Sequence, residues 1–276
     1  MIPMKHQATK CKIWIAWILC VFLLVGGIAL IAYPFVAQAM SARRGIAVQD
    51  VYDTAVEGLP QEQKDVLLEE AQRYNADLIT RSAVGYKYDE ILTIDASGML
   101  GKITIPSLGI QLPIYHGIGD EILAKGVGHM PDTSFPVSGD SVHAVLSAHS
   151  GYPEMEAFDK INQLTLGDVF YVSILGETYA YEVNQIRTVL PDEVTEYIAI
   201  QNGKNYCTLL TCTPYGINTH RLLVRGERGE KVSFSEPAQE PVGYISTGWW
   251  VATILSMAVL SVAIILILAT RKGRKK

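Results

Sequence analysis

The sequence predicts an all-β domain, a closed or nearly closed barrel, which follows a helical segment and lies between two transmembrane helices. After Gly101, short segments rich in valine, isoleucine, threonine, tyrosine and leucine alternate with turns rich in glycine, proline and asparagine. Seven or eight such strands in one domain are typical of a β-barrel. The predicted strands are residues 102–105, 110–114, 143–148, 169–174, 178–189, 206–212 and 221–225.

Two apolar stretches, residues 13–36 and 248–269, predict the transmembrane helices. Each reaches the roughly 20 residues that a helix needs to cross the hydrocarbon core of a bilayer. The tail at 270–276 is strongly basic, and basic residues next to a span tend to stay in the cytoplasm. We therefore expect residues 1–12 and the tail to be cytoplasmic and everything between the spans to be extracellular.

A cleaved signal peptide is the alternative interpretation of the first apolar stretch. Residues 37–39, Ala-Gln-Ala, resemble a small-residue cleavage site. The apolar stretch is longer than the roughly 7–15 residues that are usual in a signal peptide, which favours an uncleaved anchor.

Residues 37–98 are predicted to be a helical segment with a possible lid, and the barrel is predicted over 99–232. Within the first range, 49–79 has helical periodicity, and Leu59-Pro60 interrupts it at a point where proline suits the first turn of a new helix. The apolar residues that recur at helical spacing are Val66, Leu67, Ala71, Tyr74 and Leu78. Residues 233–247 contain two prolines and many polar residues, which predicts a linker.

The distribution of charge argues against nucleic-acid binding. All 28 acidic residues lie between Asp50 and Glu240, against 13 basic residues in the same range, a net charge of −15 there. Nucleic-acid binding requires clustered basic residues, so we expect no nucleic-acid partner. No spacing of histidine, cysteine and carboxylates typical of a metal site is present, so we expect neither a metal nor a cofactor.

Two cysteines lie in the predicted barrel, Cys207 and Cys212. They are five positions apart in one predicted strand, so their side chains point to opposite faces, and a disulfide would distort the backbone. Cys212 ends its strand beside a loop that contains proline and glycine, where a side chain can be rigidly held and still meet solvent. We therefore interpret Cys212 as a candidate nucleophile; the alternative is a buried structural cysteine.

A cysteine nucleophile needs a partner, because a thiol ordinarily has a pKa of about 8.5 and only the thiolate attacks well. His149 ends one apolar strand as Cys212 ends another, which makes it the candidate general acid and base. His143 shares the strand face of His149 but lies at the far end. His116 and His129 are placed in glycine-flanked turns, where a hydrogen-bonding role is expected.

Arg221 follows Cys212 after a short loop, so neighbouring strands can bring both side chains to one end of the barrel. A guanidinium in that place can hold a peptide carbonyl or stabilise an oxyanion. The alternative is a surface ion pair with one of the many acidic residues.

Four segments resemble the sortase family, and within it the class C pilin polymerases. These are residues 112–117, 126–129, 143–151 and 208–228, the last of which reads TLLTCTPYGINTHRLLVRGER. The resemblance covers about residues 101–228.

The resemblance implies an eight-stranded sortase barrel on a Gram-positive cell surface, with Cys212 as nucleophile, His149 as acid and base, and Arg221 as oxyanion stabiliser. Thr211, directly before the nucleophile, is a candidate substrate contact. The resemblance also implies cleavage of an LPxTG-like sorting signal between threonine and glycine, through a thioester, followed by transfer to a pilin lysine amine. The alternatives are a housekeeping-type sortase that attaches proteins to cell-wall precursor, and an inactive sortase-like scaffold.

The sequence departs from the family pattern in two places. The chain has Ala148 and Ser150 around the histidine, where the family often has glycine and arginine. Residues 76–98 contain no proline, so the Asp-Pro-aromatic motif of a class C lid is absent as written, and Gly85–Asp89 is the candidate aromatic plug.

Overall fold

The computed structural model describes residues 5–80, 86–95, 97–152 and 155–229 of the 276-residue chain. The chain divides into two units, Met1–Ala39 with Ala238–Lys276, and Met40–Pro237. We describe each by itself.

The first unit contains the beginning of helix α1 (Lys5–Gly58). Large apolar side chains are exposed along it, among them Trp14, Phe22 and Leu30. No helix within the described ranges has both the length and the apolar character needed to cross a bilayer. The predicted span at 13–36 is therefore not supported, and the one at 248–269 lies outside the described residues.

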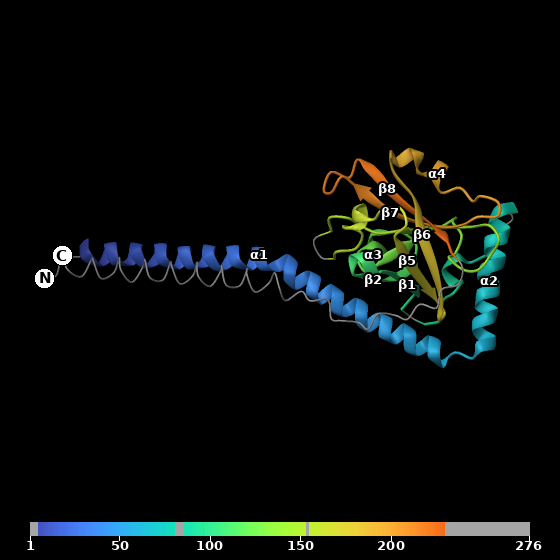
Figure 1. The fold of residues 1–276 in the computed structure, drawn as a ribbon. Helices are drawn as coiled ribbons and strands as arrows, with labels where there is room; N and C mark the ends of the chain where they lie inside the picture. The colour runs from blue at the N-terminus through green and yellow to red at the C-terminus, as the bar shows by residue number, and fades with distance from the viewer. Residues whose placement is uncertain (1–4, 81–85, 96, 153–154, 230–276) are drawn as a thin grey trace. The chain divides into compact units, whose positions relative to one another are not determined.

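The second unit is built around a closed barrel of eight strands, in the order β1-β2-β3-β4-β7-β8-β6-β5 (Figure 1). The pairs β2–β3 and β4–β7 are parallel and the others antiparallel, so the predicted eight-stranded barrel is confirmed. The strands are β1 (Met99–Ile105), β2 (Ile110–His116), β3 (Val127–His129), β4 (Val142–Ser147), β5 (Val169–Ile174), β6 (Glu177–Val189), β7 (Asn205–Thr213) and β8 (His220–Arg228).

Short helices connect the strands, and one longer helix precedes them. The α-helices after α1 are α2 (Gln61–Thr80), α3 (Asp120–Leu123) and α4 (Val194–Tyr197). Single turns of 3-10 helix occupy Tyr88–Glu90, Pro106–Leu108, Ile161–Gln163 and Pro191–Glu193. The predicted helix break is confirmed, because α1 ends at Gly58 and α2 begins directly after Pro60.

Strand β3 is not among the strands that the sequence predicts, because the sequence pattern places His129 in a turn. The strand has only three residues and contains a glycine, so it carries little strand signal. A Cβ at Gly128 would lie 2.1 Å from the carbonyl oxygen of Gly117, so this position accepts only glycine. The close approach of the Gly117 segment therefore requires glycine at position 128, and this glycine weakens the strand signal in the sequence.

Strand β7 is buried on both faces, which sets up the candidate site. Its inward side chains, such as Leu209, join the main core with Leu146 and Val224. The outward side chains form a separate apolar group, which we call the outer cluster: Val145, Val189, Val194, Leu210 and Leu223. Helix α4, which supplies Val194, covers this β7–β8 side of the barrel (Figure 1).

The helical segment is fastened to the barrel by buried polar contacts. The Tyr52 hydroxyl donates to the Leu100 carbonyl at 2.7 Å and accepts from the Leu175 amide at 3.1 Å. On α2, the Asn75 side chain donates to the Phe135 carbonyl at 2.9 Å, and the Phe135 amide donates back at 2.8 Å. Asn75 thus satisfies both backbone groups of a buried residue.

We expect Asn75→Leu to lower the free energy of unfolding by about 3 kcal/mol, because it leaves a buried amide and a buried carbonyl unpaired. Chemical denaturation measures this loss. Asn162→Leu, the same substitution at an exposed position, is the control and should change stability by less than about 0.5 kcal/mol. Equal losses in the two variants would contradict the role of Asn75.

Candidate active site

The strand register brings the three predicted catalytic residues to one edge of the barrel. In the antiparallel β7–β8 pair, Cys212 lies directly opposite Arg221. In the parallel β4–β7 pair, Ser147 lies opposite Leu210, so His149, two residues further on, is level with Cys212. Side chains that face each other across a strand pair lie on the same face of the sheet.

That face is the outer one. Alternation along β7 places Cys212 on the side of Leu210, and alternation along β8 places Arg221 on the side of Leu223, so both follow the outer cluster. Cys212 is a free thiol and is half-buried, as are His149 and Arg221. A thiol in this position can reach solvent while two flanking strands hold its backbone.

Cys207 has the opposite environment, as the five-residue spacing predicts. It is free and fully buried in the main core, and burial raises the pKa of its thiol. It therefore stays protonated, and Cys212 is the cysteine of the barrel that is accessible for reaction.

Hydrogen bonds fasten the segment around His149 to the end of β7. The Thr211 hydroxyl donates to the Ala148 carbonyl at 2.7 Å, and the Ser150 hydroxyl donates to the Cys212 carbonyl at 2.7 Å. The imidazole of His149 stacks on the ring of Tyr152, with centroids 5.2 Å apart and planes at 17°. Thr211 is buried, so its described contact is with the neighbouring strand; its prediction as a substrate contact stays a prediction.

Arg221 holds the loop that joins β7 to β8. Its Nη1 donates to the carbonyls of Asn218 and His220, each at 3.1 Å. Within the described part of the chain it makes no ion pair with a carboxylate, so the alternative of a surface ion pair finds no support. A guanidinium has five N–H donors, and the described bonds use Nη1, so this group can also bind a substrate oxygen.

The other predicted hydrogen-bonding histidines do have fixed partners. The Nε2 atom of His116 bonds the Ile91 carbonyl at 2.8 Å. His129 is fully buried and bonds the Ser134 carbonyl through Nε2 at 2.9 Å, and burial lowers its pKa to about 4. These contacts use the two imidazoles to join loops to the barrel.

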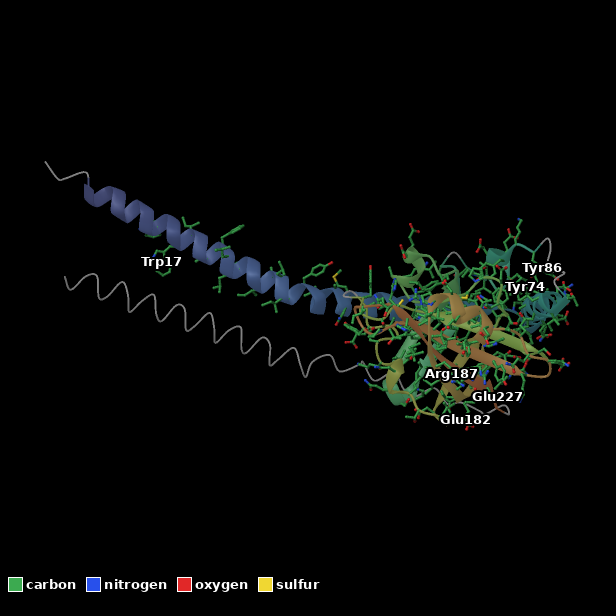
Figure 2. The ribbon with its side chains drawn as sticks, turned by 90° about the horizontal axis from the view of Figure 1, so that it is seen from above. Trp17, Tyr74, Tyr86, Glu182, Arg187 and Glu227 are labelled. Atoms are coloured by element: carbon green, nitrogen blue, oxygen red, sulfur yellow. The ribbon has the colours of Figure 1, made fainter. Side chains whose placement is uncertain are left out.

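The tyrosines of the predicted aromatic plug pack against the core and α2, and none of their described contacts is with Cys212, His149 or Arg221. The Tyr88 hydroxyl donates to the His129 carbonyl at 2.8 Å, and its ring stacks on Phe135 at 5.6 Å. Tyr86 packs edge-on against Tyr74 on α2, with centroids 5.6 Å apart (Figure 2). Both rings are thus occupied by core and α2 contacts, because the apolar surface available to this segment is there.

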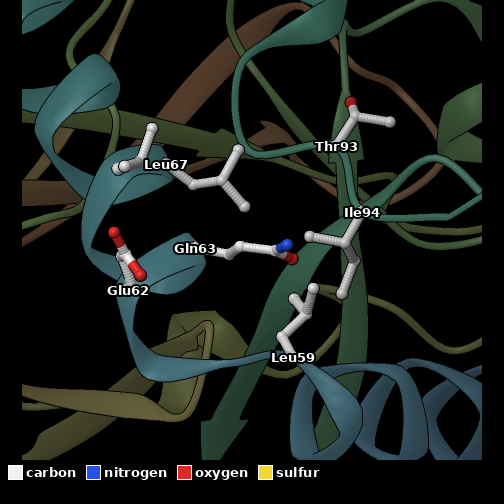
Figure 3. A pocket seen from close by; sticks show the side chains of 7 residues that line it. Leu59, Glu62, Gln63, Leu67, Thr93 and Ile94 are labelled. Atoms are coloured by element: carbon white, nitrogen blue, oxygen red, sulfur yellow. The ribbon is translucent and has the colours of Figure 1, made fainter.

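A cleft of about 520 Å³ lies between the α1–α2 junction and the segment that leads to β1 (Figure 3). The residues that line it are Leu59, Glu62, Gln63, Val66, Leu67, Thr93 and Ile94. None of the predicted catalytic residues belongs to it. Val66 is 56% exposed, so part of the apolar stripe predicted for α2 faces this cleft instead of the core.

Two features of the site were not foreseen. The side chains of Ser150 and Tyr152 contact the segment of Cys212 and His149, and helix α4 covers the outer cluster beside them. The sequence signal for the ring contact is Tyr152, an aromatic residue three positions after His149. Helix α4 has four residues, which is too short for a periodic pattern.

Comparison with known proteins agrees with this arrangement. Residues 103–229 match the sortase domain family. The solved structure of Clostridium perfringens sortase C with the C-terminal cell wall sorting motif is 45% identical, covers 67% of this chain and 99% of its own, and has a TM-score of 0.62. Streptococcus pneumoniae sortase C is 35% identical over 69% of this chain and 99% of its own, with a TM-score of 0.60.

Among curated proteins, sortase A of Streptococcus agalactiae is 24% identical over 80% of this chain and 87% of its own length. The barrel and these matches define the chain as a cysteine transpeptidase. The chain belongs to the sortase family, and its structural relatives are class C sortases. Membership of this family indicates a membrane-associated, extracellular catalytic domain.

His143, on the same outer face, carries a pH dependence of stability. Its Nδ1 bonds the Ala199 carbonyl at 3.0 Å, and its Nε2 bonds the Thr208 hydroxyl at 2.8 Å. Burial lowers its pKa to about 4, and Arg225 acts in the same direction. Because the folded state favours neutral His143, this stability is complete above about pH 6.5 and is lost as the pH falls toward 4.

We expect the free energy of unfolding to fall by about 3 kcal/mol for this histidine between pH 6.5 and 4. His143→Asn retains a donor near Nδ1 but cannot take up a proton, so its stability should depend less steeply on pH. Thr208→Val is the control: it loses the hydroxyl, keeps the imidazole and should retain the steep dependence. Denaturation curves measured across this pH range test the prediction, and parallel profiles for wild type and His143→Asn would contradict it.

Proposed function

We propose that this protein cleaves an LPxTG-like sorting signal between threonine and glycine and joins the new carboxyl end to a lysine amine of a pilin subunit. The observation that carries the proposal is the register of three strand ends, which sets Cys212 opposite Arg221 and level with His149. Cysteine, imidazole and guanidinium are the groups that acyl transfer through a thioester requires.

The first half of the reaction forms the thioester. The Cys212 thiolate attacks the threonine carbonyl carbon, and the negative charge that develops on the carbonyl oxygen is stabilised by the Arg221 guanidinium. The bond from threonine to the glycine nitrogen breaks, and His149 donates a proton to this leaving amine.

The second half releases the product. A neutral lysine amine attacks the thioester carbonyl, His149 takes the proton from the attacking nitrogen, and the sulfur leaves as thiolate. An isopeptide bond replaces the thioester, and the Cys212–His149 pair returns to its starting state.

The outer cluster supports binding of a peptide with apolar residues. It continues from Cys212 along the same face to α4, where Tyr197 and Ile198 are only partly buried. Burial of leucine and proline side chains of a sorting signal against these partly buried side chains would be favourable at about 25 cal/mol per Å².

The transfer to pilin rests on the relatives. The Streptococcus pneumoniae structure is described in terms of pilin substrate specificity, and another relative, 38% identical, is sortase C1 of a pilus island in GBS. The Clostridium perfringens relative was solved with a cell wall sorting motif. These relatives favour a pilin substrate for this chain over the housekeeping alternative.

The proposed location is the outer surface of a Gram-positive cell membrane. We place residues 13–36 and 248–269 in the membrane, with both termini cytoplasmic. The support is the uncharged length of each stretch in the sequence, together with exposed apolar side chains such as Phe22 and Leu30 at the start of α1.

Cys212→Ala should eliminate the covalent adduct between the protein and a sorting-signal peptide, because Cys207, the other cysteine of the barrel, is buried and cannot form the thioester. Mass spectrometry of the full chain in detergent detects the adduct by its added mass. Cys207→Ala is the matched control: it removes the buried thiol, which the mechanism does not use, and should retain the adduct. An adduct on Cys212→Ala would refute the assignment, and so would its absence from both wild type and Cys207→Ala, which is the outcome expected of an inactive scaffold.

A competition between amines distinguishes pilin assembly from attachment to the cell wall. Given a sorting-signal peptide, the full chain should transfer it to a purified pilin about tenfold faster than to a glycine amine, a discrimination of about 1.4 kcal/mol. Gel mobility and mass spectrometry identify the isopeptide product. A preference for the glycine amine would contradict the pilin proposal and favour the housekeeping alternative.

A further inference from the structure

The pairing of β4 with β7 continues past the end of β4 by means of side chains. The last backbone bond of this series runs from the Ala148 amide to the Leu210 carbonyl at 3.1 Å. Beyond it, the Thr211 hydroxyl donates to the Ala148 carbonyl and the Ser150 hydroxyl to the Cys212 carbonyl, each at 2.7 Å. These two hydroxyl bonds lie immediately before and after His149 in the chain, so they fix its backbone to the strand end that carries the nucleophile.

The imidazole itself has a second contact. The ring of Tyr152 stacks on His149 with the centroids 5.2 Å apart and the planes at 17°. Both residues are half-buried, so the stacked pair stands at the surface beside Cys212. A stacked ring restricts rotation of the imidazole, and aromatic pairs of this kind are stabilising beyond the area they bury.

Hydrogen bonds join the two ends of the loop that carries Tyr152. The Asp159 carboxylate accepts hydrogen bonds from the amides of Gly151 at 2.8 Å and Ala157 at 3.1 Å. The Phe158 amide donates to the His149 carbonyl at 3.0 Å. Gly151 has a φ of +79°, which glycine adopts without strain and which turns the chain sharply between Ser150 and Tyr152.

We propose that Ser150 and Tyr152 are positioning residues for acyl transfer: Ser150 sets the distance of the His149 backbone from Cys212, and Tyr152 sets the plane of its ring. The proposal rests on the proposed function, in which His149 exchanges protons with the leaving and attacking amines. Proton transfer requires correct distance and alignment, and small displacements of a catalytic group reduce rates strongly. Ser150 is also a position at which this sequence departs from the pattern that it otherwise resembles.

A purely structural role makes a different prediction from a positioning role. If the Ser150 bond only stabilises the fold, its loss lowers the melting temperature and leaves the reaction of the folded enzyme unchanged. If it positions His149, its loss lowers kcat while KM for the sorting-signal peptide stays the same, because peptide binding does not depend on the imidazole.

The test of Ser150 compares three variants of the full chain in detergent. Ser150→Ala should reduce kcat for sorting-signal cleavage about tenfold, and Ser150→Thr, which retains a hydroxyl, should restore most of the rate. Ser173→Ala is the matched control, because Ser173 makes a hydroxyl bond of 2.8 Å with Thr178 between β5 and β6. It should leave kcat and KM unchanged.

The test of Tyr152 compares a variant that keeps the aromatic ring with a variant that removes it. Tyr152→Phe keeps the stacked ring and should retain most of kcat, and Tyr152→Ala should lower kcat about tenfold while KM stays the same. The inference is overturned if Ser150→Ala and Tyr152→Ala both match Ser173→Ala in kcat and KM while Cys212→Ala is inactive. If Cys212→Ala still forms the peptide adduct, the proposed function itself fails, and that outcome is distinct from the first.

Discussion

Everything at the candidate site depends on the position of β7 between a parallel and an antiparallel neighbour. Its parallel pairing with β4 sends both strands toward the same edge, and its antiparallel pairing with β8 returns the chain from that edge. Three residues from three strand ends therefore lie at one level of the barrel. The hydrogen-bond ladders that close the barrel also set the spacing of the reactive groups.

The sequence was sufficient where a pattern has a single structural meaning. Alternation predicted that Cys207 and Cys212 face opposite ways, and Pro60 marked the break between α1 and α2. It was insufficient where distant segments decide. Strand β3 carries glycine because the Gly117 carbonyl lies within contact distance, and Tyr88 is held by its hydrogen bond to the His129 carbonyl; neither neighbour is adjacent in sequence.

The surroundings of the candidate histidine show the same limit. A serine and a tyrosine shortly after His149 are unremarkable as sequence, because both are common in loops. Their contacts with Cys212 and the imidazole appear only when β4 and β7 lie side by side and Asp159 folds the loop back. Sequence reasoning thus named candidates for the reacting groups, and the contacts that hold these candidates in place required the fold.

The double burial of β7 has a consequence for how this protein can change over generations. A single inserted or deleted residue between Cys207 and Cys212 would reverse the face to which one of the two sulfurs points. Either the Cys212 thiol would then be buried in the apolar core, or the Cys207 thiol would be exposed to solvent. Exposed loops generally tolerate changes in length. This stretch of β7 should not, because its length decides which sulfur faces solvent.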